Sequence, residues 1–371
     1  MPLAGIAWQA MQYILGFRRL GFECWYIEDH GANPYDPREN SVSMSCSYNV
    51  SFLEQAMRSF GMENRWYYWD AIKDIDYGMT KARTRKLYQT CDLLINLCGA
   101  TRLRSEHMAS PIRIMIDTDP VYEQIRYAQA DPVARAYLDA HTHFFTYGEN
   151  VGGPGWIVPL CGINWKPTRP PVVLGQWRVS PQNSGPWTTI ATWENKGKNI
   201  DFAGERYVWS KHVNFVKFLD LPKRTGEKFL MAMLPPDKRV ERQVRESGWQ
   251  LTDPRPVSGS MEAYAEFIRN SRGEFTVAKD IYARTNSGWF SDRSVCYLAS
   301  GRPVVTMNTG FSRFYPASKG LIDFTSVPEA EAGIREVASD YERHSRAARE
   351  VAECYFSSDS VLTRLLADVG F

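Results

Sequence analysis

Residues 287–305 combine the residue types that could hold a phosphate. They read SGWFSDRS at 287–294 and YLASGRPVV at 297–305. The pattern predicts a glycine turn at Gly288, followed by a helix that begins at Ser291 or Asp292 and ends at Gly301. A buried strand is expected next, at 303–307.

A helix that begins on such a turn offers a binding place for an anion. The first N–H groups of a helix have no partner within it, and the positive end of the helix dipole lies beside them. Arg293 and Ser294 would add side-chain donors, of which the charged arginine is the stronger. An ordinary capped helix with nothing bound explains the local pattern equally well.

Four further basic residues could reach the same anion. Arg284 lies between the strand expected at 275–278 and the glycine turn. Lys196 and Lys198 follow the first strand of the second half, where loops of parallel sheets face the ligand. Lys211 lies on an expected helix and either reaches a phosphate or lies on a solvated helix face.

The first half offers acidic and imidazole groups at strand ends. Asp117 and Asp119 follow a buried strand and could act as a base or, as an Asp-x-Asp pair, hold Mg²⁺ or Mn²⁺; turn chemistry explains the same residues. His30 follows Glu28 and Asp29 and could be a general base that a carboxylate orients. His141 and His143 alternate on a strand without a third metal ligand, which favours packing over metal binding.

These residues must be positioned by a chain that alternates helices and strands. In the first half we expect helices at 7–20, 51–60, 80–90 and 133–140 and strands at 24–27, 92–97, 112–116 and 143–147. The alternation predicts a parallel sheet covered by helices. A strand should precede the glycine-bearing loop at residues 1–5 but is absent, so either the start lies upstream or the sheet begins with the strand at 24–27.

The second half repeats the alternation after a proline-rich stretch. We expect strands at 187–193, 229–234, 250–252, 275–278 and 303–307, and helices at 210–219, 240–246, 260–270, 292–299, 327–355 and 360–369. The expected domains are 1–165 (acceptor side) and 187–352 (nucleotide side), with a linker at 166–186 and a C-terminal helix at 353–371 that packs back on the first domain. The predicted fold class is α/β with two Rossmann-like domains that face each other across a cleft.

Composition excludes several other classes. Of 371 residues, 44 are Lys or Arg and 42 are Asp or Glu, a balance that does not indicate a nucleic-acid footprint. The seven cysteines have no zinc spacing and no Cys-x-x-Cys pair, which is typical of reduced thiols in a cytoplasmic protein. No apolar stretch reaches the roughly 20 residues of a membrane span. The chain also lacks the glycine motif of dinucleotide-binding enzymes and the Gly-x-Ser-x-Gly of serine hydrolases.

The order of these parts resembles the nucleotide-sugar domain of GT-B fold glycosyltransferases of the group 1 kind. The run ASGRPVV at 299–305, followed by Asn308, Thr309, Gly310 and Phe311, is similar to the segments that enclose the donor diphosphate in that family. The resemblance covers residues 187–369 and implies that Thr309 and Gly310 contact the donor. The family also has two glutamates eight residues apart near this helix, and here those positions hold Gly288 and Cys296, with Asp292 as the nearest replacement.

The resemblance implies transfer of a sugar from a UDP- or dTDP-type donor to a hydroxyl of a small molecule or glycan, without a metal or another cofactor. The alternatives are a nucleotide-sugar-binding protein without activity and a non-hydrolysing nucleotide-sugar epimerase. No nucleic acid or integral membrane contact is expected, and a homodimer is left open.

Overall fold

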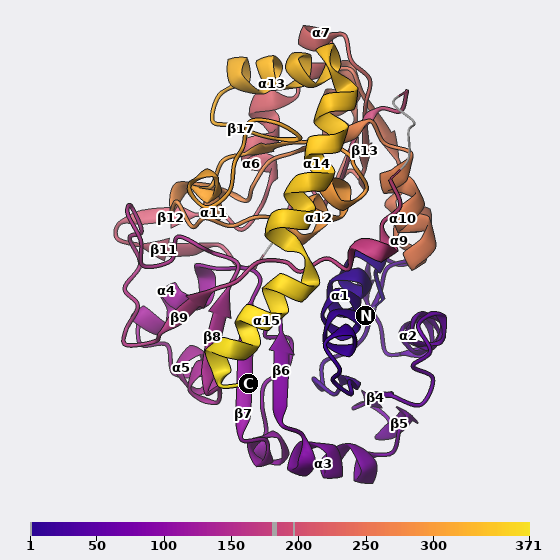
Figure 1. Cartoon of the computed structure of the whole chain (residues 1–371), viewed down its shortest axis with the longest axis vertical. Coiled ribbons are helices and arrows are strands. Elements are labelled where there is room, and N and C mark those ends of the chain that lie inside the picture. Colours follow the sequence, from indigo (N-terminus) through magenta and orange to yellow (C-terminus); the bar gives the residue numbers. More distant parts are fainter. Residues whose placement is uncertain (1, 180–183, 196) are drawn as a thin grey trace.

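The computed structural model describes residues 2–179, 184–195 and 197–371. These residues form two α/β lobes stacked along the long axis, with the first half of the chain in the lower lobe of Figure 1 and most of the second half in the upper lobe. Helix α14 (Tyr341–Phe356) lies along the upper lobe, and α15 (Ser358–Val369) returns to the lower one. The described residues contain no helix that is both long and apolar enough to cross a membrane.

The first domain contains two separate sheets with α/β connections. One has the order β1-β4-β5 and the other β6-β7-β8-β9. Strand β1 is parallel to β4, and the larger sheet is parallel throughout. The bounds are β1 (Tyr26–Glu28), β4 (Trp66–Asp70), β5 (Ile75–Gly78), β6 (Leu93–Leu97), β7 (Ile112–Asp117), β8 (His143–Thr146) and β9 (Trp165–Pro167).

Helices and one small hairpin complete this domain. Local capping explains two of the helix starts: Thr80 accepts from Arg83 N–H at α3, and Asp131 accepts from two amides at α5, where Pro132 occupies the first turn. The elements are α1 (Ala4–Arg19), β2 (Tyr35–Asp36), β3 (Ser41–Val42), α2 (Ser47–Ser59), α3 (Lys81–Thr90), η1 (Ser105–Ala109), α4 (Tyr122–Ala128) and α5 (Pro132–Asp139).

The second domain has one six-stranded parallel sheet, in the order β14-β13-β10-β15-β16-β17. Most residues of its strands are buried, as expected of a parallel sheet with both faces covered. They are β10 (Trp187–Ile190), β13 (Phe229–Ala232), β14 (Trp249–Thr252), β15 (Gly273–Thr276), β16 (Val304–Met307) and β17 (Leu321–Phe324).

The helices around this sheet are mostly short, and a hairpin extends from the domain. The hairpin consists of β11 (Ile200–Phe202) and β12 (Glu205–Tyr207). The helices are η2 (Leu174–Gln176), α6 (His212–Phe215), η3 (Val216–Phe218), α7 (Leu221–Thr225), α8 (Lys238–Glu246), α9 (Pro254–Ser258), α10 (Met261–Arg269), α11 (Asp280–Arg284), α12 (Asp292–Ala299), η4 (Phe311–Arg313) and α13 (Val327–Ser339).

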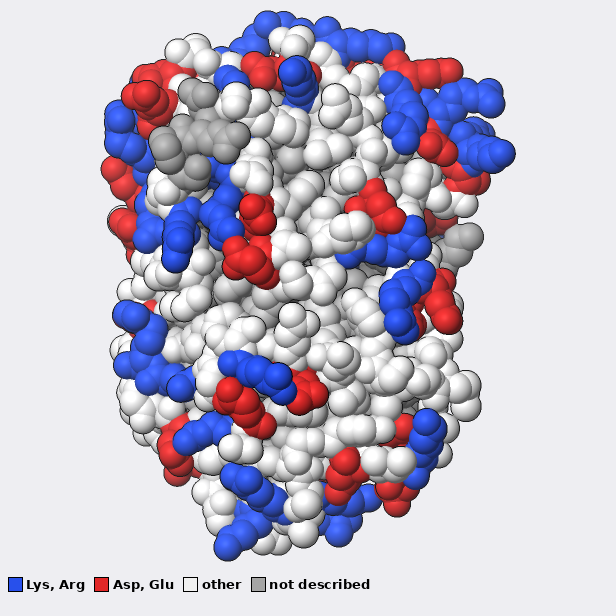
Figure 2. Space-filling view, turned by 90° about the vertical axis from the view of Figure 1, so that its right-hand side faces the viewer, with Lys and Arg blue, Asp and Glu red and all other residues white. Residues whose placement is uncertain are grey.

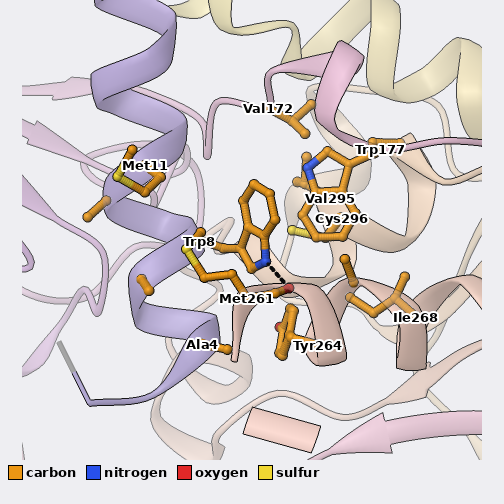
Figure 3. Packing of buried hydrophobic residues seen from close by; sticks show 14 of the residues in the cluster. Ala4, Trp8, Met11, Val172, Trp177, Met261, Tyr264, Ile268, Val295 and Cys296 are labelled. Carbon is orange, nitrogen blue, oxygen red and sulfur yellow. Dashed lines mark hydrogen bonds between the residues drawn. The ribbon is translucent and has the colours of Figure 1, made fainter. Parts of the chain in front are cut away.

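Helix α1 belongs to the first domain but packs against the second. The indole N–H of Trp8 donates to the carbonyl of Met261 in α10 at 2.9 Å, and the Trp8 ring lies 4.8 Å from that of Trp177 (Figure 3). Val295 and Cys296 of α12 belong to the same buried cluster. The two domains therefore share one hydrophobic core around α1.

The segment expected as a linker is also tied into the core. The backbone of Val172 exchanges hydrogen bonds with Phe356 and Ser358, and Trp177 is buried. Residues 180–183 of this segment lie outside the described residues. On α15, Leu362 and Leu365 pack with strand β7 of the first domain.

The predicted α/β fold class with two domains is confirmed. Two details differ. The helix expected at 327–355 is divided at Asp340, whose non-helical backbone ends α13 while its side chain caps α14. The helix expected at 210–219 is a short α-turn followed by a 3₁₀ turn, because α7 starts soon afterwards with Pro222 in its first turn.

Charged side chains are mixed on the face drawn in Figure 2. Lys and Arg alternate with Asp and Glu around both lobes instead of gathering in one basic field. This face therefore presents no single basic field to a polyanion.

Candidate functional site

A cavity of about 1120 Å³ lies where the two domains meet. Its walls in the first domain come from α1, β1, β6 and the loop after β7. Its walls in the second domain are Ile190, Ser258, Tyr264, Trp289, Asp292 and Arg293. Ile190 ends β10, so the cavity lies at the carboxyl end of this strand, where open α/β sheets bind ligands.

Helix α12 directs its N-terminus toward this cavity. It begins at Asp292, as the sequence predicts, and Ser291 precedes it without a side-chain capping bond. The Asp292 carboxyl lies in this first turn and lines the cavity. A ligand phosphate at the amides of this turn would therefore lie beside the Asp292 carboxyl, and the phosphate site at this helix N-terminus stays a prediction. Burial raises the pKa of Asp292, and the charge of Arg293 opposes the shift.

Arg293 is held against the sheet by three acceptors. Its Nε donates to Glu274 Oε1 at 2.6 Å, Nη1 to the carbonyl of Ile190 at 2.7 Å and Nη2 to Thr276 Oγ1 at 3.1 Å. The Glu274 side chain is 0% exposed and that of Arg293 14% exposed. A guanidinium has five N–H groups, so about two remain for a ligand at the cavity wall.

A second cation shares the same threonine. Lys211 Nζ donates to Thr276 Oγ1 at 3.3 Å and lies 5.9 Å from the centre of the Trp289 ring. Burial lowers the pKa of Lys211 well below its usual value, and the nearby charge of Arg293 lowers it further. The structure thus brings Lys211 and Arg293 together, with Glu274 as their buried counter-charge.

Asp119 meets this region from the first domain. Its Oδ1 lies 2.7 Å from Lys279 Nζ and accepts from the hydroxyl of Tyr282, both of the second domain. Burial raises the pKa of Asp119, but the Lys279 ammonium outweighs it, so the net shift is downward. Asp119 is therefore ionised at neutral pH and lines the cavity.

Asp117 has an internal role in the same loop. It is buried, and it accepts from Gln124 Nε2 at 2.6 Å and from the N–H of Asp119 at 3.3 Å. Burial raises the pKa of Asp117 to about 7, against the opposing hydrogen bond of Gln124. Asp117 does not line the cavity, so the structure separates it from Asp119 in function. No group of three or more potential metal-ligating side chains occurs among the described residues.

His30 lines the cavity after β1, but Asp29 does not orient it. Asp29 instead binds Arg104, His107 and Tyr88. The Nδ1 of His30 accepts from the N–H of Ala32 at 3.0 Å. Burial lowers the pKa of His30, and in the neutral ring the proton then lies on Nε2, where it can be donated into the cavity.

Gly288 and its neighbours support the site from outside the cavity. Gly288 has φ +74°, and a Cβ there would lie 2.6 Å from the backbone nitrogen of Asn150 in the first domain. Its N–H donates to the carbonyl of Thr309, and the Thr309 hydroxyl donates to the carbonyl of Trp289. The predicted donor contacts Gly288 and Thr309 therefore brace the turn between the domains.

The other predicted residues lie elsewhere. Gly310 has φ +98° and packs against Asn286, and Ser294 is buried within α12. Arg284 does not reach the cavity: it pairs with Glu205 and donates to the carbonyl of Arg206, on the hairpin β11–β12. Lys198 lies near the rings of Tyr122 and Trp209, and Lys196 is outside the described residues.

Sequence reasoning missed Lys279, Glu274 and Trp289. Lys279 follows β15 at its carboxyl end, a position that parallel-sheet topology favours for ligand contacts, so this residue could have been found. Glu274 lies within a buried strand, and nothing in the local sequence indicates that it pairs with Arg293 of α12.

Comparisons with known proteins support the architecture. No model of a known protein family matches the sequence. No curated protein matches it either. Among solved structures, an α-glucosyltransferase in complex with UDP is 11% identical with a TM-score of 0.57, and covers 99% of this chain and 96% of its own.

Two further solved structures have the same fold. HepE from Anabaena in complex with UDP-glucose is 9% identical with a TM-score of 0.53, covering 99% of this chain and 95% of its own. AviGT4, a glycosyltransferase involved in avilamycin A biosynthesis, is 11% identical with a TM-score of 0.50, covering 97% and 88%. At this identity, the likeness shows that the chain has the GT-B fold.

Proposed function

We propose that this protein is a glycosyltransferase that moves a sugar from a nucleoside diphosphate sugar to a hydroxyl group of an acceptor. The observation that carries the proposal is that one cavity joins the N-terminus of α12 and Arg293 of the second domain to Asp119 and His30 of the first. A guanidinium and an ionised carboxylate thus line the same cavity between the domains.

The cationic side suits the leaving group. In the transfer, the bond between the anomeric carbon and the diphosphate oxygen breaks, and the diphosphate departs with the electron pair. Arg293 lies at the cavity wall, where it would neutralise the charge that builds up on this oxygen, and Lys211 shares its acceptor Thr276. Both are fixed by Thr276, so little reorganisation accompanies the reaction.

The acceptor side supplies proton acceptance and positioning. The hydroxyl oxygen of the acceptor forms the new bond to the anomeric carbon as Asp119 takes its proton, since Asp119 is ionised and lines the cavity. His30 Nε2–H donates a hydrogen bond to a sugar or acceptor hydroxyl. Asp117 is a positioning residue, because it accepts from the backbone of Asp119.

The proposed donor is of the UDP or dTDP type and the proposed acceptor is a small molecule or a glycan. Structural neighbours were solved with UDP and with UDP-glucose, which favours a uracil-type base. The proposed reaction needs no metal, because Arg293 and Lys211 supply positive charge and Asp117 and Asp119 bind different partners.

Two other functions use the same site. Gly288 and Cys296 replace two glutamates expected from the resemblance, which favours a protein that binds the donor without turnover. A nucleotide-sugar epimerase would bind the same donor and release a rearranged sugar.

The experiment that separates these functions incubates the protein with UDP-glucose and dTDP-glucose, with an acceptor mixture and with water alone, and quantifies the sugar and nucleotide products. Transfer or donor hydrolysis that survives EDTA supports the proposal. Asp119→Asn should lower turnover, whereas Asp201→Asn, at an exposed ion pair on the hairpin β11–β12, should not. An unchanged donor contradicts the enzyme, and a rearranged sugar supports the epimerase.

A further inference from the structure

The two sheets of the first domain turn open edges toward each other. β4 is the neighbour of β1 in its sheet, and β7 is the neighbour of β6. The N–H of Tyr26 donates to Arg65 beside β4, so the alternation along β1 turns the backbone of Ile27 to the opposite side. By the same alternation, the register of β6 with β7 turns the backbones of Leu93 and Ile95 away from β7.

The large cavity continues between these two edges. Residues 24–30 and 93–98 form its sides, and Tyr13, Ile14 and Phe17 of α1 lie over it. All three residues of β1 and four of the five of β6 are half-buried, whereas most residues of β7 and of the strands of the second domain are fully buried. The two open edges therefore border a space, not a packed core.

The space has the size of one strand. A five-residue strand with about 3.3 Å rise, 4.8 Å strand spacing and 10 Å layer spacing fills roughly 800 Å³. The cavity measures about 1120 Å³, so it is large enough to hold such a strand.

The second domain shows what belongs in such a place. Its sheet has β10, the first strand of the domain, between β13 and β15, and β10 is parallel to both. The first domain follows the same order. Its strands β4 and β1 take the places of β14 and β13, and its strands β6, β7 and β8 take the places of β15, β16 and β17. A gap remains in the place of β10. The gap falls on the position of the central strand.

We propose that an extended segment of the same polypeptide, joined to Leu3, fills this slot as a strand parallel to β1 and β6. Leu3 and Gly5 line the cavity together with Glu28 and Cys98. Glu28 is the last residue of β1, and Cys98 directly follows the last residue of β6. A strand that runs parallel to β1 and β6 ends at this point, so a short turn connects it to α1. The proposal rests on the two open edges and does not depend on the proposed function.

The neighbours of the slot define the segment. Its side chains face the aromatic and aliphatic surface of α1 on one side, which requires an apolar and preferably β-branched strand. Its final turn would lie beside Asp292 and Arg293, and would add backbone N–H groups to the anion site.

The test compares the chain as printed with two N-terminal extensions. One adds the five-residue segment Val-Ile-Val-Thr-Val and a Gly-Ser-Gly turn; the other has proline at the second and fourth positions of the segment, which removes two N–H groups. Hydrogen exchange is followed at Ile27, Leu93 and Ile95. Alkylation is followed at Cys24 and Cys98, which line the cavity, with the exposed Cys161 and Cys354 as internal controls.

The β-branched extension should slow exchange at the three amides by about tenfold or more and slow alkylation of Cys24 and Cys98. Cys161 and Cys354 should react unchanged, and the proline extension should protect neither set. Equal protection by both extensions, or by neither, overturns the proposal. Protection by the separate Val-Ile-Val-Thr-Val peptide but not by the tethered one overturns the assignment to the same polypeptide.

Discussion

Asp119 Oδ1 of the first domain lies 2.7 Å from Lys279 Nζ of the second, at the wall of the interdomain cavity. The same ammonium lies 3.9 Å from the centre of the Trp209 ring. The ion pair thus ties the position of the first domain to the cationic wall of the second. Its protonation state couples the geometry of the site to pH.

The Asp119–Lys279 pair predicts an acid-dependent contribution to stability. The net pKa shift of Asp119 is downward in the folded protein, so this contribution is full above the unfolded pKa and disappears as pH falls through the folded pKa. The Asp119 side chain is 46% exposed, so Asp119→Asn should lower the free energy of unfolding by about 1 kcal/mol or less at pH 7.

The measurement is urea unfolding of wild type, Asp119→Asn and Asp201→Asn at pH 7, 5 and 3. The difference between Asp119→Asn and wild type should shrink toward pH 3. A difference that grows on acidification would contradict the pairing.

Arg293 and Glu274 should behave as a buried unit. Arg293→Gln alone leaves the fully buried Glu274 without its counter-charge and should cost about 3–5 kcal/mol of stability. The double variant Arg293→Gln, Glu274→Gln removes both charges and should recover most of this loss. Thermal unfolding of the single and double variants checks the prediction, and equal destabilisation of both would show that the ion pair is not what the core requires.

Lys211 predicts that diphosphate binding takes up a proton. Burial and the charge of Arg293 lower the pKa of Lys211 in the free protein, and a bound diphosphate beside the ammonium would raise it again. UDP affinity should therefore weaken as pH rises from 7 to 9. Calorimetry in buffers of different ionisation enthalpy would show proton uptake in the wild type, and its persistence in Lys211→Met would refute the assignment to this residue.

Replacing Gly288 by alanine should destabilise the protein through both backbone strain and a steric clash. Replacing Gly204, which has a similar φ but no close neighbour, measures the backbone strain alone. Gly204 has φ +80° with no atom within 4 Å of a Cβ, so Gly204→Ala should cost about 1–2 kcal/mol from φ alone. Gly288→Ala has a similar φ of +74° and adds a 2.6 Å contact with Asn150 of the other domain, so it should cost clearly more. Chemical unfolding of both variants tests this, and equal losses would mean that the turn moves away from Asn150 freely.

Regular elements were predictable where local chemistry decides them. Helix α12 begins at Asp292 as expected, because the glycine turn and the acidic first position act within a few residues. Strands β6 and β7 were recognisable as continuous apolar runs. Strand β4 was not predicted, since WYYWD offers no alternation and its parallel partner β1 comes from a distant position in the chain.

The site was predictable only in part. Arg293 and Lys211 lie together because two different segments meet at Thr276, and neither segment contains a sign of the other. Arg284 was expected at the anion but is held by Glu205 of a hairpin that sequence reasoning did not find. Asp119 was predicted at a strand end, whereas its partner Lys279 depends on how the domains face each other.

The most direct measurement of the central claim is a thermal-shift panel of UDP, dTDP, GDP and ADP against the wild type and the Arg293→Gln, Glu274→Gln double variant. The account predicts that a uracil- or thymine-type diphosphate raises the melting temperature of the wild type and that the double variant, still folded, loses this response. No response to any of the four nucleotides, or an equal response in the folded double variant, would contradict a diphosphate site at the N-terminus of α12.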